Sequence, residues 1–150
     1  MRGYFLYLFY IQYQKSSNFT ANLKVEEKLK LSVLKETDAG ETRVAIVPKS
    51  ISKLMSLGFE VMVETNAGVS AAFTDIDYIN AGASIVAGAK EAIELSDVIV
   101  KINPPSSENL ANLKSGQIWV SQLFHRLNED LILSLESKGV KGLSLDAMPR

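Results

Sequence analysis

Three side chains of this sequence could bind or react with a small polar molecule. Arg43 lies in a loop after an apolar run, and arginine there suits bidentate recognition of a carboxylate or phosphate. An ion pair with Glu36 or Glu41 is the competing interpretation, which composition alone favours. Lys101 follows a run of apolar residues. Burial there would disfavour the charged form of the lysine unless an anion or a carboxylate pairs with it. A lysine that extends into solvent from a strand end is equally common.

The third candidate is His125, the only histidine of the chain. Histidine can act as a general acid or base near neutral pH. However, a histidine beside Arg126 and just before a helix cap is more typical of an exposed or structural residue. The sequence contains no cysteine, which excludes disulfides, thiolate zinc sites, iron–sulfur ligation and cysteine nucleophiles. With one histidine and no metal-binding motif, we expect no metal site.

Charge balance and motifs narrow the function classes further. Lysine and arginine number 16 against 17 aspartates and glutamates, so no positive excess indicates a nucleic-acid partner. Neither a Walker A sequence, a G-x-S-x-G turn nor an H-E-x-x-H motif occurs. No G-x-G-x-x-G follows a predicted strand either, so this chain is not expected to bind NAD alone.

The elements that must position these side chains follow from the hydrophobic pattern. Helices are predicted from Pro48 to Gly58, after the capping box of Thr74 and Asp77, in AKEAIEL, after NPPS, and from Asn128. Strands are predicted in LKLSVLK, FEVMVE, SIV, DVIVKI, QIWVSQL and VKGLSL. The alternation predicts a three-layer αβα domain with a mostly parallel sheet, Rossmann-like or flavodoxin-like.

Ligands of such sheets bind beyond the carboxyl ends of the strands, where loops converge. Three loops qualify, namely the ETRVA, KINPP and SQLFHR regions, which carry Arg43, Lys101 and His125. We expect these loops to approach one another, although the order of the strands does not follow from the sequence.

Residues 1–28 differ in pattern from the rest of the chain. One early positive charge precedes about eight apolar and aromatic residues, far fewer than the ~20 that span a bilayer. A leader and a disordered extension are both open interpretations, and the N-x-T pattern at Asn18 is a weak signal. The folded domain is therefore expected to comprise residues 29–150.

Several segments between Lys30 and Arg150 resemble, in order and spacing, the family that unites the α subunit of proton-translocating NAD(P) transhydrogenase with alanine dehydrogenase. These segments are SVLKET, GETRVAIVPKSISKLMSLGFEVMVETNAG, INAGASIV, SDVIVKINPP, SGQIWVSQL and LSLDAMPR. The combination of ETRVA-x-x-P with GFEV-x-V-E-x-x-AG is specific to this group.

The resemblance assigns expected roles to individual residues. Alanine dehydrogenases of this family hold the substrate carboxylate and carbonyl with an arginine and a lysine that match Arg43 and Lys101. Their catalytic histidine aligns with Phe124, and His125 falls one residue late. This departure and the DAMPR ending both favour transhydrogenase. No catalytic side chain is then expected, because hydride passes directly between two nicotinamides and the protein only positions them.

The resemblance implies hydride transfer between NADH and NADP⁺ coupled to proton translocation. NAD(H) would be bound by a Rossmann domain that follows residue 150, with Arg150 near the cleft between the two domains, and NADP(H) by a partner domain. The 150-residue chain would be the first domain of this two-domain NAD-binding unit, truncated and inactive alone. A homodimer is implied, with membrane and NADP-binding domains or subunits as partners, at the bacterial inner membrane or in an organelle.

Two alternatives remain open at the level of sequence. One is an alanine-type, NAD-dependent amino-acid dehydrogenase in which a one-residue bulge brings His125 into the catalytic position. The other is a non-catalytic fragment that acts only in subunit association.

Overall fold

The computed structural model describes residues 28–148 of the chain. Residues 1–27, which contain Asn18 and nearly all of the segment interpreted as a leader or a disordered extension, lie outside the described residues, as does Arg150. Within the described part, no helix has the length and apolar character needed to cross a membrane.

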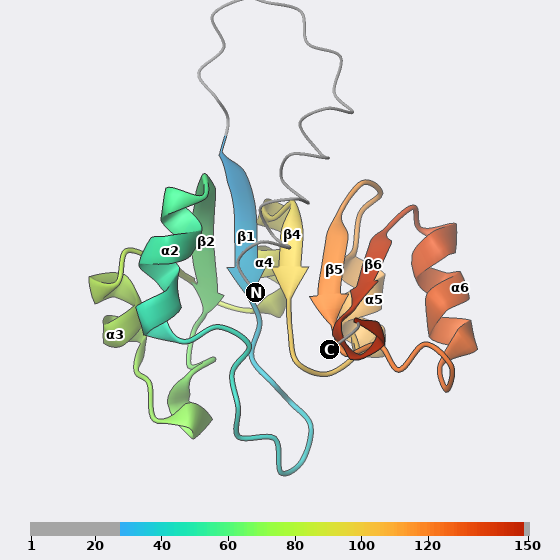
Figure 1. Cartoon of the computed structure of the whole chain (residues 1–150), viewed down its shortest axis with the longest axis horizontal. Coiled ribbons are helices and arrows are strands. Elements are labelled where there is room, and N and C mark those ends of the chain that lie inside the picture. The colour runs from blue at the N-terminus through green and yellow to red at the C-terminus, as the bar shows by residue number, and fades with distance from the viewer. Residues whose placement is uncertain (1–27, 149–150) are drawn as a thin grey trace, which may run out of the picture.

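Six parallel strands form one sheet, which confirms the predicted α/β class (Figure 1). The strand order is β3-β2-β1-β4-β5-β6. This is the doubly wound order of the Rossmann type, and it differs from the flavodoxin order. The strands are β1 (Leu29–Val33), β2 (Phe59–Glu64), β3 (Ser84–Val86), β4 (Val98–Val100), β5 (Ile118–Ser121) and β6 (Lys141–Ser144).

Helices cover both faces of the sheet, as the three-layer prediction required. The helices are α2 (Ile51–Ser56), α3 (Asp75–Asn80), α4 (Ala89–Leu95), α5 (Ser107–Asn112) and α6 (Glu129–Ser137), with short 3-10 turns η1 (Pro48–Ser50), η2 (Val69–Ala71) and η3 (Leu145–Ala147). Helices α2 and α3 contribute Ile51, Leu54 and Tyr78 to one apolar core. On the opposite face, α4 and α6 contribute Ile93 and Leu135 to a second core, which contains Trp119.

Local sequence signals explain where the first helices begin and end. The segment predicted as one helix starts with Pro48 in η1, continues as α2, and ends as Gly58 takes a φ of +93°. Helix α3 has the predicted capping box, in which the Thr74 hydroxyl accepts from the Asp77 N–H and the Asp77 carboxylate accepts from the Thr74 N–H.

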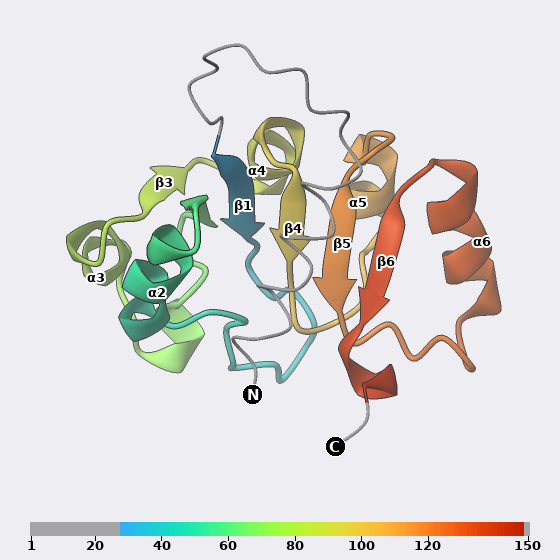
Figure 2. The same cartoon turned by 45° about the horizontal axis from the view of Figure 1, so that its top comes forward.

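Strand β1 is the topological centre of the domain. It pairs with β2 on one side and β4 on the other, so the chain winds outward in opposite directions from this point. In Figure 2 strands β1, β4, β5 and β6 run toward one edge of the sheet, where the loops after β1 and β4 lie. In doubly wound sheets this edge carries the binding crevice.

The Ser32 hydroxyl is an isolated polar group inside β1. Ser32 is fully buried between Met62 and Ile99 of the neighbouring strands, and its Oγ has no hydrogen-bond partner within residues 28–148. We expect Ser32→Ala to raise the free energy of unfolding by about 1 kcal/mol, because it removes an unpaired buried hydroxyl without adding volume. Urea unfolding followed by circular dichroism measures this change.

Ser121→Ala is the matched control for this prediction. The Ser121 Oγ accepts a hydrogen bond from the Trp119 indole at 3.0 Å in the buried core. Its removal leaves that donor unpaired and should cost about 1–2 kcal/mol. Equal losses of stability in the two variants would contradict the interpretation of Ser32.

Candidate functional site

A cavity of about 410 Å³ opens at the carboxyl edge of the sheet. It lies where the chain leaves β1, β4, β5 and β6, and it is lined by Arg43, Val44, Ala45, Val47, Ala71, Val100, Lys101, Ile102, Gln122 and Leu145. All three loops expected from the sequence to converge contribute to this lining, so that expectation is confirmed. The walls are mostly apolar, and Arg43 and Lys101 are the ionisable residues among the lining ones.

Lys101 is buried and paired with a carboxylate. Its Nζ lies 3.7 Å from Glu36 Oε2, and the two side chains are 2% and 3% exposed. The other Glu36 oxygen accepts the Ile102 N–H at 2.6 Å, which ties the loop after β1 to the end of β4. A buried ammonium is tolerable only with such a partner. Of the two possibilities left open by the sequence, the structure therefore has the buried, paired lysine.

Arg43 forms a bidentate ion pair with Glu41. Its Nε donates to Glu41 Oε1 at 2.8 Å and its Nη2 to Oε2 at 2.6 Å, while the Arg43 side chain is 63% exposed. The interpretation favoured by composition, an ion pair of Arg43, is thus what this structure contains. Since Arg43 is largely exposed, an incoming anion could compete with Glu41 for its guanidinium group.

Asn103 connects the two ion pairs, and sequence reasoning did not identify it. Its side-chain amide donates to Glu36 Oε2 at 3.2 Å and to Glu41 Oε2 at 3.4 Å. The loops after β1 and β4 are therefore joined through one network of two carboxylates, two cations and an amide. The formal charges in this network cancel. No periodic or motif signal distinguishes Asn103 from an ordinary turn residue of the NPPS segment.

The Glu41 ion pair should make part of the stability depend on pH. Hydrogen bonds from Arg43 lower the pKa of Glu41 from 4.5 to about 2. A carboxyl group whose pKa is lower in the folded state than in the unfolded state stabilises the fold at pH values above its unfolded pKa. This stabilisation is lost as the pH falls through its pKa in the folded state. The stability difference between the wild type and Glu41→Gln should therefore be constant above a pH of about 5 and shrink between 4.5 and about 2.

Urea midpoints of both proteins across this pH range measure the effect. The comparison is made as a difference because Asp77 and Asp146 also have lowered pKa values, owing mainly to hydrogen bonds from Thr74 and Ser144. A stability difference that stays constant down to a pH of about 2 would show that the ion pair is absent in solution.

Tyr78 supports the loop that carries Arg43, another contact that sequence reasoning missed. The Tyr78 ring is fully buried below α3, and its hydroxyl donates to the Ile46 carbonyl at 2.8 Å. Burial raises the pKa of Tyr78 to about 12. This bond fixes the backbone between Val44 and Val47, which lines the cavity. A tyrosine within a short capped helix is the available sequence signal, because a buried phenol requires a partner.

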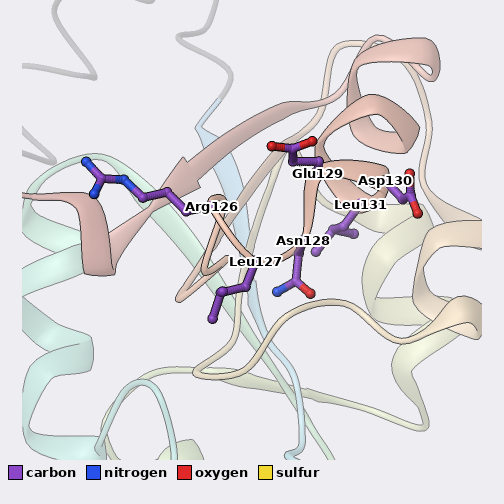
Figure 3. Close-up of a pocket in the computed structure, with 6 residues that line it drawn as sticks. All are labelled: Arg126, Leu127, Asn128, Glu129, Asp130 and Leu131. Carbon is purple, nitrogen blue, oxygen red and sulfur yellow. The ribbon is translucent and has the colours of Figure 1, made fainter.

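His125 is exposed and lies outside the lining of the cavity. Phe124, which the sequence resemblance aligned with the catalytic histidine of alanine dehydrogenases, has a φ of +47°. A second hollow, of about 340 Å³, is lined by consecutive residues at the start of α6, Arg126 to Leu131. Figure 3 shows the Arg126 side chain directed away from Glu129 and Asp130. This hollow brings together no side chains from separate elements, so we do not regard it as the functional site.

Acidic and histidine side chains do not gather into a metal-binding group in the described part of the chain. Within residues 28–148, no cluster of three or more histidine, cysteine, aspartate or glutamate residues is arranged to hold a metal ion.

Comparisons with known proteins agree with this architecture. The NAD(P) transhydrogenase subunit alpha of Haemophilus influenzae is 38% identical over 120 residues, which cover 80% of this chain and 23% of that protein. The crystal structure of transhydrogenase from Sinorhizobium meliloti matches with a TM-score of 0.76 and 33% identity, over 81% of this chain and 36% of that one. An L-alanine dehydrogenase structure matches with a TM-score of 0.73 and 30% identity, over 77% and 32%.

The chain thus spans about a quarter to a third of the length of these relatives. A sequence model of the family described as "Alanine dehydrogenase/PNT, N-terminal domain" matches residues 32–150. This range includes all the helices and strands described above except the first three residues of β1. The chain belongs to the family of alanine dehydrogenase/PNT N-terminal domains.

Proposed function

We propose that this chain is the N-terminal domain of an NAD(P) transhydrogenase α subunit, which takes part in hydride transfer between NADH and NADP⁺ coupled to proton translocation. The observation that carries the proposal is the character of the cavity at the carboxyl edge. Among its described lining residues, the ionisable ones are two cations, and His125 lies outside it. Direct transfer between two nicotinamides requires positioning and exclusion of water, not an acid or base.

The two nucleotides would be held mainly by other parts of the protein. NAD(H) would bind to a Rossmann domain following residue 150 and lie in the cleft between it and this domain, near Arg150. NADP(H) would bind to a partner domain or subunit. The assembly would contain two copies of the α subunit and associate with membrane domains that conduct the proton.

Arg43 and Lys101 would both place a cation beside this cleft, but only the Arg43 side chain would be free to move. The exposed guanidinium of Arg43 can leave Glu41 to meet a phosphate or carboxylate of the nucleotide. Lys101 is held by Glu36 and would contribute a positive charge of fixed position to the lining of the cavity. Both roles concern binding and orientation, so neither side chain is proposed to react.

The second candidate is an alanine-type dehydrogenase. The observation that favours it is that Arg43 and Lys101 line one largely apolar cavity, as a small carboxylate substrate would require. The exposed position of His125 opposes it, because oxidative deamination needs an acid or base at the reacting carbon.

One experiment separates the two candidates. The complete gene product that carries this chain is assayed for reduction of an NADP⁺ analogue by NADH and for alanine-dependent reduction of NAD⁺. We expect the first activity and not the second. Alanine-dependent reduction that disappears in the variant His125→Gln would overturn the proposal in favour of the dehydrogenase.

The 150-residue chain alone provides a further check. Since NAD(H) would be held mainly by the following domain, we expect no micromolar binding when NADH fluorescence is titrated with this chain. Tight binding would contradict the division of the cleft between two domains.

A further inference from the structure

The carboxylate of Asp146 joins the ends of two neighbouring strands. Its Oδ1 accepts hydrogen bonds from the backbone N–H groups of Leu123 at 3.0 Å and Phe124 at 3.2 Å. The Ser144 hydroxyl donates to the same oxygen at 2.6 Å. Asp146 lies in η3, directly after β6, whereas Leu123 and Phe124 lie in the loop that follows β5. One carboxylate oxygen thus accepts three hydrogen bonds from residues at the carboxyl ends of two neighbouring strands.

These contacts lie immediately beside the cavity. Gln122, which precedes Leu123, and Leu145, which precedes Asp146, both line it. The Gln122 N–H donates to the Ile102 carbonyl at 2.9 Å, so this wall is also tied to the exit of β4. The position of the wall formed by Gln122 and Leu145 therefore depends on the contacts between the segments that follow β5 and β6.

The backbone after β5 also needs an external restraint. Phe124 has a φ of +47°, a left-handed conformation that bulky side chains disfavour and that persists where surrounding contacts fix it. On the carbonyl side, the Phe124 oxygen accepts from Leu127 at 2.8 Å and from Asn128 at 3.1 Å. On the amide side, the restraint is the Asp146 carboxylate. Phe124 itself is 38% exposed, so core packing alone does not hold it.

We propose that Asp146 is a positioning residue, which fixes the Gln122–Leu145 wall of the cavity and the left-handed turn at Phe124. That this wall borders a bound nicotinamide nucleotide rests on the function proposed above. The carboxylate is well suited to this task because the Ser144 hydroxyl, followed by the backbone N–H groups, lowers the pKa of Asp146. A carboxylate oxygen accepts several donors at once, and such charge-assisted bonds are stronger than neutral ones.

The direct test is hydrogen exchange of the complete gene product, measured by mass spectrometry on peptides that cover residues 122–128 and, for comparison, strand β2. In Asp146→Ala, the Phe124 amide loses its acceptor, whereas the Leu123 amide keeps the Ser144 Oγ at 3.3 Å. The Phe124 amide should therefore exchange roughly tenfold faster and the Leu123 amide should show a smaller increase, whereas β2 should be unchanged. Ser144→Ala keeps the bonds of both amides to Asp146 and removes only the longer Leu123 bond to the Ser144 Oγ, so it should give a smaller increase at Phe124. Glu136→Gln, which removes a carboxylate from the exposed last turn of α6, is the charge-matched control.

Steady-state kinetics then distinguish a positioning role from a purely structural one. In Asp146→Ala we expect the KM for NADH to rise roughly tenfold with a smaller change in kcat, as lost orientation of a binding wall predicts, and Asp146→Asn should lie between it and the wild type. Unchanged exchange at 122–128, or faster exchange with unchanged KM, would overturn the proposal. If the unsubstituted protein lacks transhydrogenase activity, the proposed function fails, and exchange at the two amides still decides whether Asp146 holds the turn.

Discussion

Glu36→Ala is expected to lower the free energy of unfolding by about 3–5 kcal/mol, because it leaves a buried ammonium without its counter-charge. Lys101 is 2% exposed and Glu36 is its ion-pair partner at 3.7 Å. The substitution also removes the acceptor of the Ile102 N–H. A loss of this size is a large fraction of the 5–15 kcal/mol that is typical of a folded domain.

Lys101→Met should be less damaging than Glu36→Ala. In this variant, the Glu36 carboxylate keeps its hydrogen bonds from Ile102 and Asn103. The double variant Glu36→Gln with Lys101→Met replaces the pair by neutral groups of similar size, so it should recover much of the lost stability. Glu60→Ala, at an exposed position of β2, is the control and should stay within about 0.5 kcal/mol of the wild type.

Trp119 makes this comparison measurable in a single experiment. It is the only tryptophan of the chain and is fully buried in β5, so its emission during urea unfolding reports on the core of the sheet. If Glu36→Ala proves no more destabilising than Glu60→Ala, the Glu36–Lys101 pair is solvent-exposed in solution and the buried network is wrong.

The fold follows from the sequence more completely than the site does. Apolar runs of strand length separated by amphipathic segments indicate a parallel α/β domain, and Pro48, Gly58 and the Thr74 capping box mark element ends through local backbone chemistry. The order of the strands does not follow, because it depends on which neighbours pair across the sheet. The distinction between Rossmann-like and flavodoxin-like order therefore needed the structure.

The sequence predicts where the candidate site lies but not the contacts between its residues. Loops at strand ends predict the right edge of the sheet, and Arg43 and Lys101 both line the cavity there. Their contacts span long sequence separations, as between Glu36 and Ile102, which are 66 residues apart. Such contacts carry no local signal, since the same residues in an isolated segment would be solvated. The supporting roles of Asn103 and Asp146 were missed for this reason.

Gly68→Ala is expected to destabilise the domain by about 1–3 kcal/mol through steric overlap below the site. A Cβ at this position would lie 2.7 Å from Cε2 of Tyr78 and 2.9 Å from both the Cβ and the carbonyl oxygen of Phe73. The backbone of Gly68, with φ of −91° and ψ of −7°, is accessible to alanine, so the penalty comes from packing alone. Because one contact is with backbone, a rotamer change cannot relieve all of the overlap.

The effect of Gly68→Ala should reach the cavity through the Tyr78 ring. Displacement of this ring would weaken its hydrogen bond to the Ile46 carbonyl and shift the segment that includes Val44 and Val47. Tyr78→Phe isolates this step, since it deletes only the hydroxyl and should cost about 1 kcal/mol. Gly88→Ala is the matched control, because a Cβ there meets nothing within 4 Å.

We therefore expect the loss of stability to decrease from Gly68→Ala to Tyr78→Phe to Gly88→Ala, as measured by urea unfolding through Trp119. Gly88→Ala should change the free energy of unfolding by at most about 0.5 kcal/mol. If Gly68→Ala and Gly88→Ala are equally stable, the close packing of the Gly68 turn against Tyr78 and Phe73 does not exist in solution. In that case, the support of the Arg43 loop by α3 would also have to be abandoned, because both rest on the same position of the Tyr78 ring.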